Sequence, residues 1–118
     1  MSAAKFWNEL QDGRLGLPIC PAAVQDVYAG YLLWCRRCGY STSDPLKSFV
    51  VHFMRVAQLR RITSRIPDQQ AGVHRRRRVL LMGKSLPEFW RERHRIVFGV
   101  ANFRLAVRSY GRAPSGHL

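Results

Sequence analysis

The chain has 118 residues, of which 47% are hydrophobic and 23% charged, so we expect one folded domain rather than a disordered chain. Its formal net charge of +13 predicts a polyanionic partner, with nucleic acid as the first candidate. No run of about 18 apolar residues exists and the first residues lack a signal-peptide core, so we expect a cytoplasmic protein without a membrane span.

The three cysteines favour free thiols over a disulfide framework, because their number is odd. Cys35 and Cys38 have the spacing of a redox or zinc motif. They fall at the C-terminal end of a predicted helix, however, where the helix dipole disfavours a thiolate. A zinc ion would also need further ligands, such as His52. We expect no cofactor, and whether Cys20, Cys35 and Cys38 bind a metal is left open.

Two helices are predicted in the first third of the chain. Residues 2–10 have an apolar side made of Phe6, Trp7 and Leu10. Residues 21–38 begin with a proline suited to a first helical turn and end before Gly39. Their apolar residues recur at three- and four-residue steps: Val24, Val27, Tyr28, Tyr31 and Cys35. The aromatic residues at 31, 34 and 40 fit core positions better than stacking platforms for single strands.

A third helix is predicted over residues 45–58, capped by Ser43 or Asp44 and with Pro45 in its first turn. Its spacing separates two faces. The face expected to be buried comprises Leu46, Phe49, Val50, Phe53 and Ala57. The face expected to be exposed comprises Lys47, Ser48, Val51, His52 and Arg55.

A β-hairpin is predicted over residues 59–82, with strands at 59–66 and 73–82 and a polar tip at 67–72. The second strand contains the run Arg75–Arg78. Because side chains alternate along a strand, successive arginines of this run should point to opposite faces. Four arginines cannot all be buried, so the run must protrude from the sheet or lie at its edge.

The last predicted helix covers residues 86–109, after a capping-box pattern at 85–88, and we expect it to be weakened or broken near Gly99. Beyond Ile96 its apolar residues lie all round, with Phe98, Phe103 and Leu105 away from the main stripe. Such a helix is expected to be covered on every side, either as a central core helix or through a homodimer contact. Residues 110–118 are expected to form a flexible tail.

These elements predict a mostly helical α+β fold: a winged helix-turn-helix with a hairpin wing and a long C-terminal helix, forming a single domain over 1–109 with its core at 21–83. Ten basic residues and one acid lie between Pro45 and Pro87. Helix 45–58 would read bases and the hairpin would touch the DNA backbone. The candidate DNA-binding residues are Lys47, Ser48, Val51, His52, Arg55, Arg60, Arg61, Arg65, Arg75, Arg76, Arg77 and Arg78.

The segment from Val27 to Gly39, followed by Ser43 to Phe53, resembles the small winged-helix domain at the C-terminus of phage and plasmid helicase-primases. The matching positions are Tyr31, Trp34, Cys35, Gly39, Phe49 and the strand through Leu81. The resemblance covers residues 21–83 and implies DNA binding in replication or in a mobile element. Segments 1–20 and 84–118 have no counterpart in that module, so a stand-alone role, such as a repressor or a replication accessory protein, stands on equal footing with an excised module.

We therefore expect a non-catalytic protein that binds duplex DNA. No phosphate-loop motif, no acidic pair for two metals and no nucleophile with its base is present in the sequence, so an enzyme is not expected. Two alternatives stay open. One is an adaptor whose basic face meets an acidic protein, and the other is an RNA-binding module.

Overall fold

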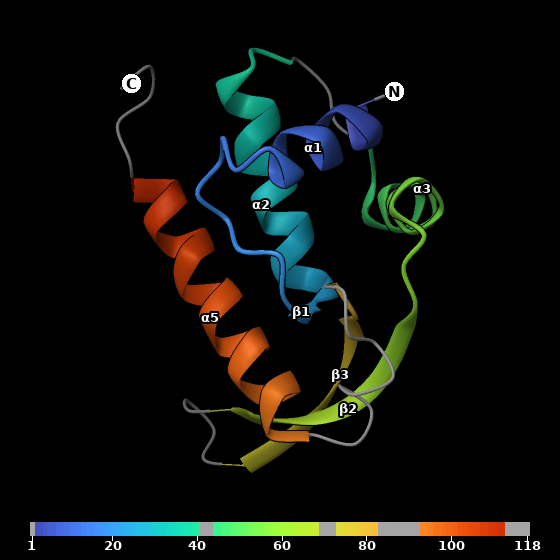
Figure 1. Ribbon diagram of the computed structural model, residues 1–118, viewed down its shortest axis with the longest axis vertical. Helices are drawn as coiled ribbons and strands as arrows, with labels where there is room; N and C mark the ends of the chain where they lie inside the picture. Colours follow the sequence, from blue (N-terminus) through green and yellow to red (C-terminus); the bar gives the residue numbers. More distant parts are fainter. Residues whose placement is uncertain (1, 41–43, 69–72, 83–92, 113–118) are drawn as a thin grey trace.

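The computed structural model describes residues 2–40, 44–68, 73–82 and 93–112. Within these residues, four helices accompany a small antiparallel sheet with strand order β1-β3-β2, which confirms the expected α+β class. The elements in chain order are α1 (Ser2–Gln11), β1 (Ala22–Ala23), α2 (Val24–Arg37), α3 (Leu46–Ala57), β2 (Arg61–Asp68), β3 (Val73–Leu80) and α5 (Arg93–Arg112) (Figure 1). None of the helices in these described ranges has the length and apolar character needed to cross a membrane.

The ends of α2 and α3 lie close to the predicted positions because both helices have well-defined C-terminal turns. Gly39 has a φ of 80°, and the N–H of Tyr40 donates to the carbonyl of Cys35 at 3.0 Å. Gln58 takes the same left-handed region at φ 54°, and the N–H of Leu59 donates to Met54 at 3.0 Å. This second turn redirects the chain from α3 into β2.

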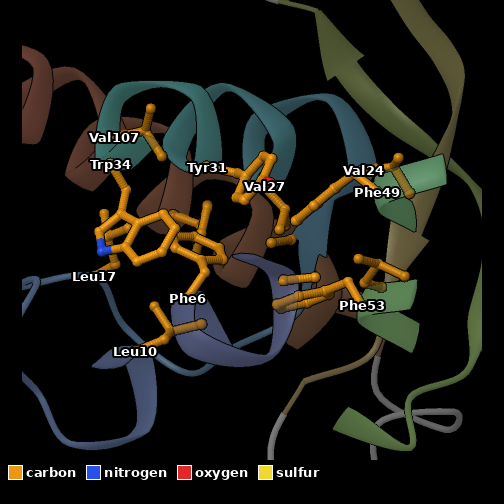
Figure 2. Packing of buried hydrophobic residues seen from close by; sticks show 14 of the residues in the cluster. Phe6, Leu10, Leu17, Val24, Val27, Tyr31, Trp34, Phe49, Phe53 and Val107 are labelled. Carbon is orange, nitrogen blue, oxygen red and sulfur yellow. The ribbon is translucent and has the colours of Figure 1, made fainter. Parts of the chain in front are cut away.

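The main core is an aromatic cluster between α1, α2 and α3 (Figure 2). The rings of Tyr31 and Phe49 stack with centroids 4.2 Å apart, and Phe6 lies 5.5 Å from both Tyr31 and Trp34. Burial of Tyr31 and Trp34 confirms the core prediction, whereas Tyr40 is exposed at the rim. The two buried polar tips have partners: Tyr31 donates to Asp44 and Trp34 donates to Glu9, each at 3.2 Å.

The short strand β1 corrects the prediction that a helix begins at residue 21. Ala22 pairs with Leu80 and Ala23 pairs with Val79, so the helix starts only at Val24. The end of β3 then alternates between two apolar clusters. Leu80 and Met82 enter the main core, while Val79 and Leu81 enter a second cluster against α5. The base of the sheet therefore separates the two clusters.

The hairpin is confirmed, and its ladder extends further toward the tip than predicted. Pro67 pairs with His74 and Asp68 pairs with Val73, so two residues assigned to the turn belong to β2. A proline is tolerated here because β2 is an edge strand of the three-stranded sheet. The remaining tip residues, 69–72, lie outside the described residues, as do the predicted capping box at 85–88 and the first part of the last helix.

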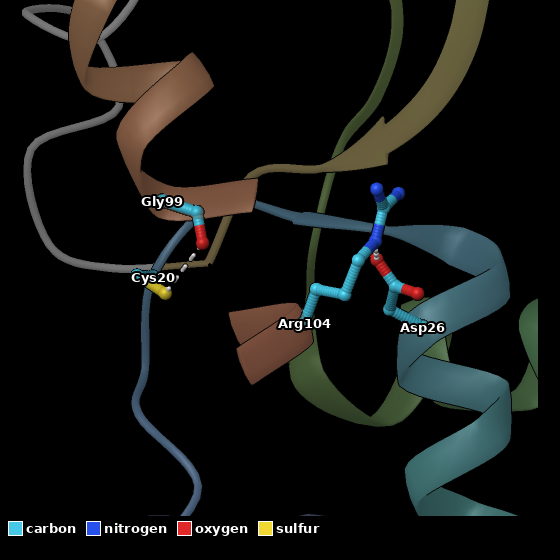
Figure 3. A network of polar contacts seen from close by, with 4 residues as sticks. All are labelled: Cys20, Asp26, Gly99 and Arg104. Atoms are coloured by element: carbon cyan, nitrogen blue, oxygen red, sulfur yellow. Dashed lines mark hydrogen bonds and ion pairs between the residues drawn. The ribbon is translucent and has the colours of Figure 1, made fainter. Parts of the chain in front are cut away.

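Helix α5 continues through Gly99, so the predicted break is wrong. A Cβ atom at this position would lie 2.8 Å from the backbone oxygen of Pro21, so the glycine allows a close approach of two backbones. The thiol of Cys20 donates to the carbonyl of Gly99 at 3.4 Å (Figure 3). The close packing against Pro21 leaves no room for a side chain at this position, and tertiary contact overrides the low helix propensity of glycine.

The upper half of α5 runs parallel to α2 (Figure 1). Arg104 forms an ion pair with Asp26 at 3.1 Å (Figure 3), and Arg37 stacks over the ring of Tyr110 with 3.8 Å from guanidinium carbon to centroid. Arg37 also donates to the carbonyl of Tyr110. Residues 110–112, which were expected to belong to a flexible tail, are part of α5, and Tyr110 is buried; the rest of the expected tail lies outside the described residues.

Helix α5 is not covered on all sides within the single chain. Phe103 is fully buried, but Phe98 and Leu105 are 73% and 60% exposed. The interpretation of α5 as a central core helix is therefore wrong: it covers one side of α2 and of the sheet and leaves its opposite side open.

Candidate nucleic-acid interface

The arginines of the hairpin are sorted onto two faces by the strand register. Residues paired across antiparallel strands point to the same face, and their neighbours along each strand point to the other. The pairs Ile62↔Val79 and Ile66↔Arg75 therefore share one face, while Arg65↔Arg76 and Thr63↔Arg78 share the other. We call the second set the arginine face, and it comprises Arg61, Arg65, Arg76 and Arg78.

The opposite face of the hairpin packs against α5. Ile66 and Val79 are buried there together with Ile96 and Val100, and Ile62 lies against them. Arg77 is half-buried and Arg75 is exposed on this side. The structure therefore does not bring all the predicted arginines together: Arg75 and Arg77 are separated from the arginine face by the thickness of the sheet.

All four side chains of the arginine face are exposed. Arg65 stands directly opposite Arg76, a position where Cβ atoms are about 5 Å apart and like charges destabilise the strand pair. Thr63, which lies opposite Arg78, adds an exposed hydroxyl to the same face. Thr63 was not predicted as a site residue. The alternation of β2 could have indicated it, once the side occupied by Ile62 and Ile66 was known to be the packed one.

The arginine face lies on the same side of the sheet as the helical core. Leu80 is the partner of Arg61 across the ladder, and its side chain is buried in the main cluster that contains Phe49 and Phe53 of α3. The same side of the sheet thus meets the helices at its base and presents arginines toward its tip.

Helix α3 presents four of its five predicted contact residues to solvent. Lys47, Ser48 and Arg55 are exposed, and Val51 is 51% exposed. His52 differs, because it is half-buried and its Nδ1 atom is buried without a hydrogen-bond partner in the described part of the chain. Arg60, in the short connection from α3 to β2, is exposed as well. Cationic side chains therefore follow the chain from the end of α3 into the hairpin.

The pKa of each cysteine thiol lies above its ordinary value. Burial raises the pKa of Cys20 to about 11 and also raises the pKa of the buried Cys35. The pKa of Cys38, an exposed residue, is raised as well, by partial desolvation and by the Glu9 carboxylate. Such thiols are poor nucleophiles, because the thiolate is the reactive form. Within the described ranges, no three His, Cys, Asp or Glu side chains are grouped so that they could hold a metal ion.

No protein-family model matches this sequence, and searches of curated proteins and of solved structures find no significant match. The resemblance to the winged-helix module of helicase-primases accordingly rests on residues 21–83 alone and stays a prediction.

Proposed function

We propose that this chain is a non-catalytic DNA-binding protein of winged-helix type, acting in the replication or transcriptional control of a phage, plasmid or other mobile element. The observation that carries the proposal is the arginine face, on which four exposed guanidinium groups share one side of a two-stranded ribbon and Arg65 opposes Arg76. A row of phosphates complements such a face in charge, because each guanidinium group can donate to phosphate oxygens. The mobile-element setting rests on the sequence resemblance alone.

The order of the elements supports the winged-helix form. Two packed helices, α2 and α3, are followed directly by an antiparallel hairpin, and β1 joins the hairpin to the helical core through its pairing with β3. In this arrangement α3 would enter the major groove and the hairpin would lie along the flanking backbone. Phosphate contacts from arginines position the protein, whereas contacts to base edges specify the sequence.

The exposed side chains of α3 suggest which DNA contacts each residue would make. Lys47, Ser48 and Arg55 can hydrogen-bond base edges or phosphates, and Val51 can contact a thymine methyl group. His52 is a weaker candidate because of its partial burial. The location of the arginine face on the side of the sheet that meets the α3 core supports a single surface made of both elements.

The first experiment measures binding to a duplex of random sequence as a function of salt. Replacing Arg61, Arg65, Arg76 and Arg78 with alanine should remove about 3 to 4 from the slope of log K against log salt, since each phosphate contact contributes about 0.9. The matched control removes four exposed arginines elsewhere: Arg14, Arg36, Arg108 and Arg112. Equal losses in the two variants would mean that only net charge matters, and the interface proposed here would be wrong.

The second experiment selects bound duplexes from a random pool at physiological salt, in parallel with a pool of structured RNA. We expect an enriched duplex motif, which Ser48→Ala and Val51→Ala should relax while leaving the salt slope unchanged. Preferential enrichment of RNA would favour the RNA-binding alternative. Binding of neither pool, even in dilute buffer, would end the nucleic-acid proposal and favour an acidic protein as the partner of the basic face.

A further inference from the structure

The outer side of α5 carries the two most exposed large hydrophobic residues among those that the structure describes. Phe98 is 73% exposed and Leu105 is 60% exposed, against 51% for Val51, the next in order. Isolated apolar residues on a surface are ordinary, but two large ones on one helix call for an explanation of their placement.

Phe98 and Leu105 lie on the same side of the helix. They are seven residues apart, which is two helical turns and about 10 Å along the axis. The exposed Ala101 and Asn102 lie between them, and the three apolar residues Phe98, Ala101 and Leu105 form what we call the α5 strip. The buried residues of α5 lie on the opposite side of the helix: Ile96, Val100, Phe103, Val107 and Tyr110.

The surroundings of the α5 strip are cationic. The sequence of α5 contains five arginines and no acidic residue. Arg104 forms an ion pair with Asp26 within the chain. Arg108 and Arg112 are exposed and lie beyond Leu105, toward the C-terminal end of the helix. A partner that covers this strip must therefore supply apolar side chains to the strip and carboxylates to the arginines that follow it.

We propose that the α5 strip binds an amphipathic helix of another protein, one whose apolar face is bordered by Asp and Glu. Two helices of this kind pair by packing apolar residues at heptad-like spacing, with flanking charges that select the partner. A second copy of this chain fits less well, because it would bring the same arginines together with no acid in the helix to pair with them and would join two chains of charge +13.

This surface is distinct from the proposed nucleic-acid interface. The N-terminal half of α5 covers the apolar face of the hairpin through Ile96 and Val100, whereas the arginine face lies on the other side of the sheet. The two surfaces can therefore be occupied at the same time, and the proposal goes beyond DNA binding: it assigns the chain a second, acidic protein partner.

The test uses two synthetic helical peptides with the same leucines at heptad positions, one bordered by glutamates and the other by lysines. Titrated into the full chain, the glutamate peptide should bind at least about tenfold more tightly than the lysine peptide. The double variant Phe98→Ser and Leu105→Ser should lose at least about tenfold in affinity for it. The control variant Ile19→Ser and Val56→Ser removes two other exposed hydrophobic residues and should bind as the wild type does.

Two results would overturn the proposal. One is equal binding of the two peptides, or binding that survives the Phe98 and Leu105 substitutions. The other is concentration-dependent self-association of the wild-type chain in sedimentation that the same double variant abolishes, since the strip would then be covered by a second copy. Thermal unfolding of both variants checks that the substitutions leave the fold intact, because all four side chains are exposed and should change stability little.

Discussion

The helical core and the hairpin differ in how they place their polar groups: the core buries them with partners, and the hairpin exposes them on one face. Between α1, α2 and α3, aromatic rings cover one another, and the polar tips of Tyr31 and Trp34 find carboxylates within the chain. The hairpin buries only one face, against α5, and turns four arginines outward on the other. The core buries its rings and their polar tips within the chain, whereas the arginine face is exposed to solvent and carries a concentrated positive charge.

Helix α5 holds these two regions together. Its lower half packs Ile96 and Val100 on the hairpin, and its upper half is joined to α2 through the ion pair of Arg104 with Asp26. We therefore predict that substitutions in the helical core change stability and that substitutions on the arginine face change binding. Substitutions where α5 packs on the sheet should affect how the hairpin is held against the helical core.

The largest loss of stability is expected from Phe49→Ala. Phe49 is fully buried and its ring contacts those of Tyr31, Phe53 and Phe6. Truncation of such a ring costs about 3–5 kcal/mol of unfolding free energy, through lost transfer energy and the cavity left behind. Urea or thermal denaturation measures the change in unfolding free energy. The comparison variant, Arg78→Ala, should stay within about 0.5 kcal/mol of wild type. Similar stabilities for the two variants would contradict the division between core and hairpin.

A smaller loss is expected from Gly99→Ala, which acts where α5 crosses the start of the sheet. The added Cβ would meet the backbone oxygen of Pro21 at 2.8 Å. Overpacking of about 1–3 kcal/mol then exceeds the gain of about 1 kcal/mol from replacing glycine in a helix. We expect a net destabilisation of about 1 kcal/mol in thermal unfolding.

Gly30→Ala is the matched control for that substitution. A Cβ at Gly30 would lie 3.5 Å from Leu17 and 3.6 Å from Val107, which is ordinary contact. The helix propensity gain should therefore dominate, with a stabilisation of about 0.5–1 kcal/mol. Stabilisation by both substitutions would show that α5 can move away from Pro21 at little cost.

The contrast between these two glycines shows what the sequence could predict. The periodicity of apolar residues and Gly39 placed α2 and α3 within a few residues, because local spacing and turn chemistry determine where these helices end. The unbroken course of α5 through Gly99 depends on a contact with Pro21 far away in the sequence. No local pattern carries that information.

The same reasoning explains β1 and the two faces of the hairpin. Ala22 and Ala23 have low intrinsic strand preference, and they are extended because β3 lies beside them. For the arginines, alternation was predictable, but which pair faces outward depends on where α5 packs. Along α5 itself, apolar residues all round the helix predicted complete burial, and the structure leaves Phe98 and Leu105 exposed.

On the arginine face, Arg76→Glu should change stability and binding in opposite directions. Glutamate at this position would face Arg65 across the ladder, replacing a like-charge pair with an attractive one. We expect a gain of about 0.2–1 kcal/mol in unfolding free energy, which shrinks in high salt, together with weaker binding to DNA. Arg78→Glu makes the same change of charge opposite Thr63, and should stabilise less. Equal stabilisation by the two variants would assign the effect to net charge.

The last prediction is confined to alkaline pH and concerns Cys20, whose thiol donates to the carbonyl of Gly99 and so links the start of the sheet to α5. Burial raises the pKa of its thiol from 9.0 to about 11, so the folded chain holds this proton more tightly than the unfolded chain does. Its contribution is therefore fully present below about pH 9 and is lost as the pH rises toward 11. The stability of wild type relative to Cys20→Ala in thermal unfolding should be constant below about pH 9 and should fall as the pH rises toward 11. A constant difference would mean that the thiol is not more tightly protonated in the folded state, and that the contact with Gly99 contributes packing alone.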